Sequence, residues 1–330
     1  MTHQLPTYSV AIRTLGRAGS LYQRELDSLS RQTVQPEKIV VYIAEGYDLP
    51  KETIGREEYV YASKGMVSQR ALDYKEITSE YILMLDDDVE LAPNAVETLL
   101  THIVEYGADC IAPDTFHNHR MTPIQKLYAV ATNLVLPYSG GKTAFKIHSC
   151  GSFSYINSPG QGVYPSQSAA GPASLWSRRA LLGIRYEDER WMDRFSFAYG
   201  DEMLFFYKLV VNGGSLMVDF SANVTHLDGK TSRNETYLAD PERFATRTML
   251  LFIVWWRTIY SLPTNSPLKK AYCALMFALK QLFCLISVIA CALLGRSLRP
   301  VTGTLKGLKK GYEYVHSEQY RQVPEFLITK

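Results

Sequence analysis

Three adjacent carboxylates, Asp86, Asp87 and Asp88, are the residues of this sequence best suited to metal or phosphate chemistry. They directly follow the apolar run at residues 81–85, which has the pattern of a strand buried on both faces. Neighbouring carboxylates repel one another, and a hard divalent cation between them relieves the repulsion. Mg²⁺ commonly takes one or two carboxylates and completes its shell with water and substrate phosphate oxygens. The triplet is therefore a candidate metal and phosphate site, and the alternative is a solvated turn before the next helix.

The elements around the triplet predict an α/β fold with a nucleotide-binding type of half. Alternating strands and helices in the first 110 residues are typical of a parallel sheet, in which ligands bind beyond the carboxyl ends of the strands. The predicted strands lie at residues 8–13, 38–44, 59–61 and 81–85. The predicted helices run from residue 21 to near residues 32–33, over residues 66–77, and from Pro93 through residue 104. Asp86 to Asp88 would emerge at that binding edge.

The second half of the chain is less regular. Residues 114–172 are rich in Gly, Ser, Pro and Tyr, and a segment of this length without clear elements is usually a functional loop or a set of short hairpins. Regular structure resumes at residues 175–182. Asp201 and Glu202 precede a predicted helix that Gly213 closes, and a strand is predicted at residues 216–220.

Charge and hydropathy set the last 90 residues apart. Residues 241–330 carry 13 Lys and Arg against 4 Asp and Glu, whereas the first 240 residues have a net charge of −7. The basic residues alternate with Leu, Phe, Ile and Trp, a pattern that indicates an anionic membrane surface rather than nucleic acid.

The apolar segments of this tail are residues 249–256 and 271–294, the second interrupted by Lys280 and Gln281. The uninterrupted stretch that follows has 13 residues, fewer than the roughly 20 needed to span a bilayer. The sequence therefore predicts helices lying in the membrane interface. The alternatives are a helical cap packed on the rest of the protein and a re-entrant hairpin or span. Five cysteines without a CxxC pair and an N-terminus unlike a signal peptide predict the cytoplasmic face of the membrane, with peripheral or monotopic attachment.

Several motifs, in order, resemble the inverting glycosyltransferases of family 2, which have the GT-A fold, and in particular the bacterial polysaccharide-assembly type. Residues 8–17 (YSVAIRTLGR) resemble the opening strand of the family, and residues 26–33 the helix that follows. The other matching segments are residues 65–70, 80–90, 190–208 and 224–226. Together they cover roughly residues 8–230.

The resemblance implies a nucleotide-sugar donor whose diphosphate is held through Mn²⁺ or Mg²⁺. Asp86 and Asp88 would form an Asp-x-Asp pair, with Asp88 on the metal and Asp86 toward the ribose or the metal, and His226 would add a nitrogen ligand. Further donor contacts are expected from Thr14, Glu45, Arg70, Asp86 and Asp87. Two departures stand out: Arg13 occupies a position where the family usually has Pro, and Glu45 stands in for its Asp-Asp-x-Ser segment.

The resemblance also implies a catalytic base that removes the proton of the acceptor hydroxyl. Counting back six residues from Lys208 assigns this role to Glu202, with Asp201 as the alternative, because the order of the two acids is reversed relative to the family. A third interpretation is that both acids only stabilise the N-terminus of the following helix.

The predicted function is metal-dependent, inverting transfer of a sugar from a UDP-, dTDP- or GDP-sugar to a glycan or polyprenyl-linked acceptor, as in capsule or O-antigen synthesis. The predicted domains are a GT-A domain at 1–243, divided into a nucleotide-binding half (1–113) and an acceptor half (114–243), and a membrane-associating tail at 244–330. The alternatives are a non-catalytic, membrane-peripheral protein that binds nucleotide sugars and a sugar-1-phosphate nucleotidyltransferase.

Overall fold

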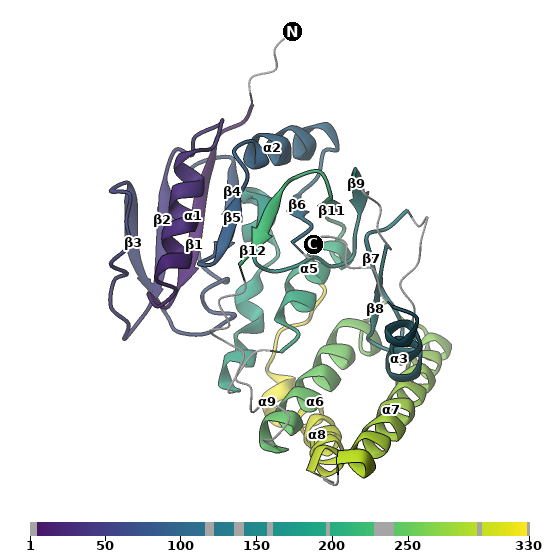
Figure 1. Ribbon diagram of the computed structural model, residues 1–330. Coiled ribbons are helices and arrows are strands. Elements are labelled where there is room, and N and C mark those ends of the chain that lie inside the picture. The colour runs from purple at the N-terminus through teal and green to yellow at the C-terminus, as the bar shows by residue number, and fades with distance from the viewer. Residues whose placement is uncertain are drawn as a thin grey trace.

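A mixed eight-stranded sheet lies at the centre of the computed structural model, which describes residues 5–115, 122–134, 142–156, 161–195, 199–227, 241–295 and 299–328. Helices lie on both faces of the sheet (Figure 1). In spatial order its strands are β3 (Glu57–Ala62), β2 (Ile39–Ala44), β1 (Tyr8–Thr14), β4 (Tyr81–Asp86), β10 (Ala173–Ser177), β6 (Cys110–Pro113), β11 (Leu216–Asp219) and β9 (Val163–Pro165). Two small antiparallel pairs, β5 (Val89–Leu91) with β12 (Val224–His226) and β7 (Phe145–Ile147) with β8 (Phe153–Tyr155), complete the strands of the described residues.

Strands β1, β2, β3 and β4 are parallel, as predicted for the nucleotide-binding half. Successive side chains of a strand point to opposite faces, so both faces of a central strand must be apolar to be buried. In β4, Leu83 and Leu85 join the core beneath α1 (Ser20–Ser30) and α2 (Ala95–Glu105), whereas Ile82 and Met84 join the core on the other face.

The order of strands in the parallel half changes direction between β1 and β4. The chain passes from β1 outward to β2 and β3, then returns to place β4 on the opposite side of β1. In open α/β sheets such a switch point leaves a crevice at the carboxyl ends of the strands. Here those ends are Thr14 of β1 and Asp86 of β4, the latter followed by Asp87 and Asp88.

The prediction of a helix at residues 66–77 is wrong: this segment forms consecutive turns. The backbone N–H groups of Val67 and Ser68 donate to the carboxylate of Asp193, at 3.0 and 2.8 Å, and Tyr74 has a φ of 46°. A carboxylate 126 residues from Val67 therefore supplies two hydrogen bonds to this segment, and no local periodicity could reveal it.

The irregular segment at residues 114–172 contains α3 (Pro123–Asn133), β7, β8 and β9, and parts of it lie outside the described residues. Thr122 caps α3 through a reciprocal capping box with Gln125. The second half continues with α4 (Arg178–Gly183), the 3-10 helix η1 (Tyr186–Arg194) and α5 (Asp201–Val211).

The tail is helical. It consists of α6 (Pro241–Trp255), the π-helix η2 (Trp256–Tyr260), α7 (Pro267–Gly295), α8 (Arg299–Val315) and α9 (Glu318–Arg321). Helix α7 runs through Lys280 and Gln281 without a break, so these residues do not divide it as the sequence suggested. Within the part of the chain that the structure describes, α7 is one helix that is long and apolar enough to cross a membrane.

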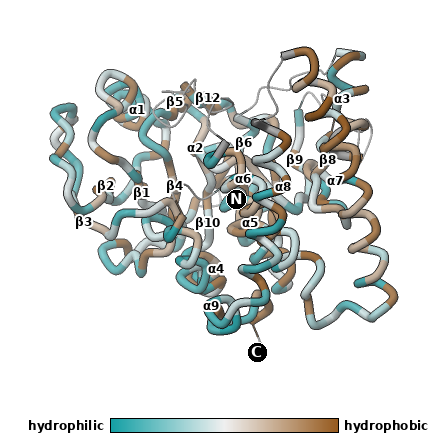
Figure 2. The backbone as a smooth tube through the Cα atoms, turned by 90° about the horizontal axis from the view of Figure 1, so that it is seen from below, coloured by the Kyte–Doolittle hydropathy of each residue, from teal (hydrophilic) through white to brown (hydrophobic). Residues whose placement is uncertain are grey.

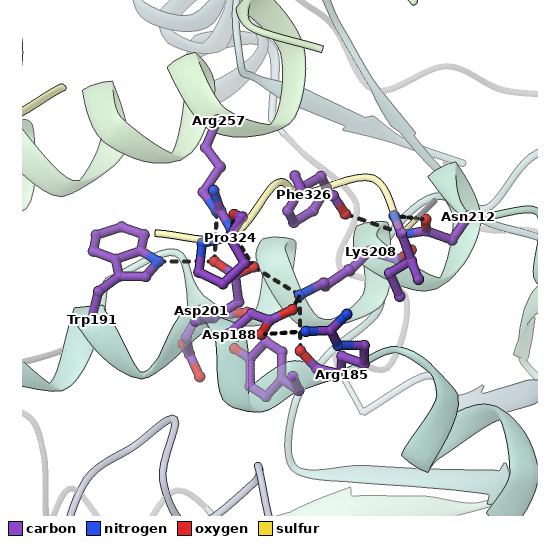
Figure 3. A network of polar contacts seen from close by, with 12 residues as sticks. Arg185, Asp188, Trp191, Asp201, Lys208, Asn212, Arg257, Pro324 and Phe326 are labelled. Carbon is purple, nitrogen blue, oxygen red and sulfur yellow. Dashed lines mark hydrogen bonds and ion pairs between the residues drawn. The ribbon is translucent and has the colours of Figure 1, made fainter. Parts of the chain in front are cut away.

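A buried network of charges joins the tail to the sheet domain (Figure 3). Glu189 of η1, which has no solvent exposure, accepts hydrogen bonds from Lys208 of α5 at 3.0 Å and from Arg257 of η2 at 2.6 and 2.8 Å. Burial raises the pKa of Glu189, but Arg257 and Lys208 outweigh this effect and hold the pKa below its ordinary value. Glu189 is therefore a charged centre that requires its partner from the tail.

The last described residues also return to α5. Arg257 donates to the carbonyl of Pro324 at 2.8 Å, and Asn212, which follows α5, exchanges hydrogen bonds with Phe326 and Ile328. Residues on the two sides of the predicted domain boundary near residue 243 are thus in direct contact.

Candidate active site

The acidic triplet lies at the carboxyl end of β4, next to the end of β1. Arg13 and Asp86 are register partners on these two strands, and their side chains form an ion pair. The hydroxyl of Thr14 donates to Asp87 at 2.5 Å. Burial raises the pKa of Asp87 to about 6, and the neighbouring charges of Asp86 and Asp88 act in the same direction, although the Thr14 hydrogen bond opposes them. The predicted donor residues Thr14, Asp86 and Asp87 therefore do meet.

Asp88 lies beside His226, because β5 and β12 pair in a register that places His226 opposite Val89. The distance from His226 Nε2 to Asp88 Oδ1 is 3.2 Å. Two ligands at right angles, each about 2.1 Å from a cation, would be separated by about 3 Å, so the pair has a spacing suited to a shared Mn²⁺ or Mg²⁺.

Asp86 does not complete this pair in the structure, since its carboxylate faces Arg13. Across the described residues, no group of three or more His, Cys, Asp and Glu side chains is arranged to hold a metal ion. The two protein ligands Asp88 and His226 still fit the way in which Mg²⁺ is bound at phosphate sites, where water and substrate oxygens fill the remaining positions. The three-residue metal set stays a prediction.

A second group of charges lies around the N-terminus of α5. Arg70, in the turn segment, forms an ion pair with Asp201, the first residue of α5, and both side chains are almost completely buried. Tyr186 holds the same turn of helix by donating to the carbonyl of Asp201 at 3.0 Å. The carboxylate of Asp201 is therefore already paired and inaccessible.

Glu202 has a different environment from its neighbour. It is half-buried, and its Oε1 accepts a hydrogen bond from the backbone N–H of Gly171 at 3.1 Å. Burial and the adjacent charge of Asp201 raise the pKa of Glu202 to about 7, despite the opposing effect of Arg70. A carboxyl with a pKa near the working pH is well suited to accept a proton.

Residues 171–172 connect the two groups of charges. Gly171 donates to Glu202, and the carbonyl of the next residue, Pro172, accepts from the backbone N–H of Asp86 at 2.9 Å. The charge of Asp86 also contributes to the raised pKa of Glu202. The donor-side carboxylates and the α5 acids therefore form one site.

Glu45 lies apart from these charges. It follows β2, its backbone N–H donates to Ala62 at 2.8 Å, and its side chain is exposed. Close by, Arg17 and Lys64 lie over the ring of Tyr47, at 4.7 and 5.0 Å from its centroid. Glu45 is therefore an exposed residue after β2, and its contact with a nucleotide base stays a prediction.

Two residues of the site were not assigned a role from the sequence. Arg13 was noted only as a departure from the usual Pro, yet it neutralises Asp86. Gly171 had no sequence signal, but a Cβ atom at this position would overlap with Glu202 Oε1 and with Arg70. An arginine directly before Thr14 in a buried strand could have indicated a partner for the acidic triplet.

The fold agrees with the comparisons with known proteins. Residues 59–154 match the family described as glycosyl transferase family 2. This part of the chain is a family 2 glycosyltransferase region, and the sheet around it has the GT-A fold that the sequence predicted. Among curated proteins, none has a sequence significantly similar to this chain.

Several solved structures are similar to this chain at low sequence identity. The structure described as GalNAc-T7 with UDP, GalNAc and Mn²⁺ is 15% identical, with a TM-score of 0.50 over 84% of this chain and 56% of that chain. S. aureus TarS is 14% identical, with a TM-score of 0.46 over 82% of this chain and 42% of that chain. The mannosyltransferase PcManGT from Pyrobaculum calidifontis, in complex with GDP-Man and Mn²⁺, is 14% identical, with a TM-score of 0.47 over 97% and 83%. This chain thus spans about half the length of the first two.

Proposed function

We propose that this protein transfers a sugar from a nucleotide-sugar donor to an acceptor hydroxyl, with inversion at the anomeric carbon. The observation that carries the proposal is the link through residues 171–172 between Glu202 and Asp86, two residues before the Asp88 that pairs with His226. A phosphate-binding side and a proton-accepting side are the two parts that such a transfer needs.

The donor side is assigned to the carboxyl ends of β1 and β4. Asp88 and His226 would hold a divalent cation, and Thr14, Asp87, Arg70 and Glu45 would contact the nucleotide sugar, a UDP-, dTDP- or GDP-sugar. When bound, the cation supplies positive charge that stabilises the departing nucleoside diphosphate. The similar GalNAc-T7 structure holds UDP and Mn²⁺, which supports this choice of ligands.

Glu202 is assigned the role of catalytic base. It would accept the proton of the acceptor hydroxyl while that oxygen attacks the anomeric carbon, and the sugar–phosphate bond breaks on the opposite side. Its half-buried position and raised pKa support this assignment over Asp201, whose carboxylate is occupied by Arg70. Asp201 then acts as a positioning residue for the first turn of α5, through its ion pair with Arg70.

The acceptor is assigned to a membrane surface at the cytoplasmic face. The tail has an excess of nine basic residues over acidic ones, and α7 is highly apolar, features that support peripheral or monotopic attachment. A growing glycan on a polyprenyl-linked lipid, as in bacterial capsule or O-antigen synthesis, is the simplest acceptor that uses such a surface.

The test is release of nucleoside diphosphate from UDP-, dTDP- and GDP-sugars by the full chain, in Mn²⁺ and in excess chelator. Release should require the metal, and Asp88→Asn should lower it by about 100-fold or more, because a metal ligand and its charge are lost. Asp73→Asn, at an exposed turn, is the matched control and should leave release unchanged.

The other outcomes reject the proposal in distinct ways. Full activity in chelator would remove the metal assignment. Release of pyrophosphate from a sugar-1-phosphate and a nucleoside triphosphate would identify a nucleotidyltransferase. Metal-dependent donor binding without any turnover, with glycan or lipid acceptors present, would identify a binding protein.

A further inference from the structure

The exposed apolar side chains of this molecule are concentrated on two helices, α3 and α7. Among the described residues, these helices hold more than half of the large apolar side chains that are exposed. Ile124 and Leu127 on α3 are 79% and 71% exposed, and Leu282 and Ile286 on α7 are 53% and 54% exposed. A soluble monomer rarely exposes an apolar patch of this kind without a partner for it.

Helix α7 has two distinct faces. On the inner face, Cys273 and Phe277 are buried, and the Phe277 ring stacks on Trp255 with 3.9 Å between centroids. On the outer face, Leu275, Leu282 and Ile286 follow one another at spacings of seven and four residues, so they form a single stripe. Helix α7 is therefore packed on the protein through its inner face, and only its outer stripe is exposed.

Helix α3 lies beside α7, although the two are separated by more than a hundred residues of sequence. They pack against each other, and they are neighbours in both views of the molecule (Figures 1 and 2). Figure 2 shows apolar colouring along both. The exposed side chains of α3 thus extend the apolar surface of α7 onto the acceptor half of the sheet domain.

The charges on the two helices identify the partner that this surface fits. Neither helix contains Asp or Glu, and the lysines available to the outer surface are Lys126, Lys269 and Lys270, since Lys280 is half-buried on the inner face of α7. An apolar stripe with only basic residues beside it complements the interface of an anionic bilayer, where apolar area and lysines contribute together. At about 1.5 Å per residue, the 29 residues of α7 extend for roughly 44 Å, a length that suits a lipid surface better than a groove in a protein.

We propose that α3 and α7 form a single lipid-binding surface, with both helices lying along the interface of an anionic bilayer. This surface would bring the active site to an acceptor in the membrane, a role that rests on the proposed function. Two helices from different parts of the chain fix the orientation of the site relative to the membrane, whereas a single tail helix would leave it free to rotate.

Flotation with vesicles of phosphatidylglycerol and phosphatidylcholine tests the surface. The full chain should float at low salt, and less of it should float at high salt or with phosphatidylcholine alone. Leu127→Glu on α3 and Ile286→Glu on α7 should each lower partitioning by roughly tenfold. Val104→Glu, a matched change at a 52% exposed position on α2, should float like the unmodified chain.

Each of three results would overturn the proposal. In the first, Leu127→Glu floats normally while Ile286→Glu does not, so α3 takes no part. In the second, both variants float normally. In the third, the unmodified chain ignores vesicles and is a dimer that the two variants convert to monomers, so a second copy covers the face.

Donor hydrolysis by the same variants separates this proposal from the proposed function. Nucleoside diphosphate release from a soluble donor does not require the membrane, and all four proteins should show it. If the unmodified chain does not float but releases nucleoside diphosphate normally, the lipid-binding surface is rejected and the proposed reaction stands. Normal flotation without release in any of them would reject the reaction and leave the lipid surface standing.

Discussion

At the scale of single residues, the two adjacent acids at the start of α5 have different environments. Asp201 is paired with Arg70 and buried, whereas Glu202 is half-buried and bonded to one backbone N–H. This difference comes from the helix, which points successive side chains in different directions. Sequence order alone left the base open between them, and the environment favours Glu202.

The Glu202 environment predicts a pH dependence. A base must be ionised before it can accept a proton, and the pKa of Glu202 is raised to about 7 by burial and by Asp201. We therefore expect the transfer rate at saturating donor and acceptor to rise with pH up to about 7 and to level off above it.

Glu202→Gln removes the base and should abolish transfer with little change in donor binding. Isothermal titration with the donor and Mn²⁺, beside a transfer assay, measures both quantities. Normal transfer by Glu202→Gln together with its loss in Asp201→Asn would reassign the base to Asp201.

Gly171 provides an independent test at the same scale. A methyl group at this position overlaps with Glu202 and Arg70, so Gly171→Ala should displace the base and lower turnover by about 100-fold. Gly183→Ala is the control, because a Cβ atom there meets nothing within 4 Å. Equal turnover in the two variants would show that the position of Glu202 does not depend on the Gly171 contact.

At the scale of elements, the sequence predicted the buried strands from their own composition. Strand β2 is a continuous apolar run, as is β4 up to Asp86, and their burial on both faces follows from that composition. The predicted helix at residues 66–77 is wrong, and the contact that helps to hold this segment in turns, from Asp193 to the backbone of Val67 and Ser68, comes from far along the chain. Helix α3 was missed although the sequence carried local signals for it: Ile124, Leu127 and Tyr128 recur at helical spacing, and Thr122 and Gln125 form a capping box.

The same distinction applies to the site. The acidic triplet and the two acids of α5 could be found because they are clustered in sequence, and His226 through the resemblance of residues 224–226 to a family motif. The residues that pair with these acids lie far from them in sequence. Arg13 forms an ion pair with Asp86, Gly171 donates a hydrogen bond to Glu202, and Arg70 forms an ion pair with Asp201. Such pairings depend on strand register and tertiary packing, which one sequence does not reveal.

Close packing of α6 and α8 leads to a prediction at the element scale. A Cβ atom on Gly307 would overlap with the backbone of Ala245 and with Thr248. Gly307→Ala raises intrinsic helix propensity by about 1 kcal/mol, yet we expect a net loss of about 1–3 kcal/mol because the helices must separate. Lys309→Ala, on the exposed side of α8, should change stability by less than about 0.5 kcal/mol. Chemical denaturation measures both, and a more stable Gly307→Ala variant would contradict this packing.

At the scale of the whole molecule, the tail and the sheet domain share a buried charge network. Arg257→Met leaves Glu189 with Lys208 and Trp191 alone, and removal of one partner from a buried ion network typically costs about 3–5 kcal/mol. We expect that loss in the free energy of unfolding measured in urea. Arg321→Met, at an exposed pair with Glu318, is the control and should change stability by less than about 1 kcal/mol.

A chain that ends at residue 243 would lose Arg257 together with the segment that contacts Asn212. We expect this shortened chain to lose its cooperative unfolding transition. If it instead unfolds cooperatively and binds the donor, residues 1–243 form an autonomous domain.

The contact between Asn212 and Ile328 also has a consequence for synthesis of the protein. These residues are 116 positions apart, so at ordinary translation speeds Ile328 emerges on the order of ten seconds after Asn212. Throughout that interval, Lys208 and Glu189 have no Pro324 or Phe326 segment to cover them, and the helix carrying Glu202 lacks its final support. Until residue 328 has left the ribosome, the nascent chain would therefore lack this support for α5, although its apolar helices would already be available to the membrane.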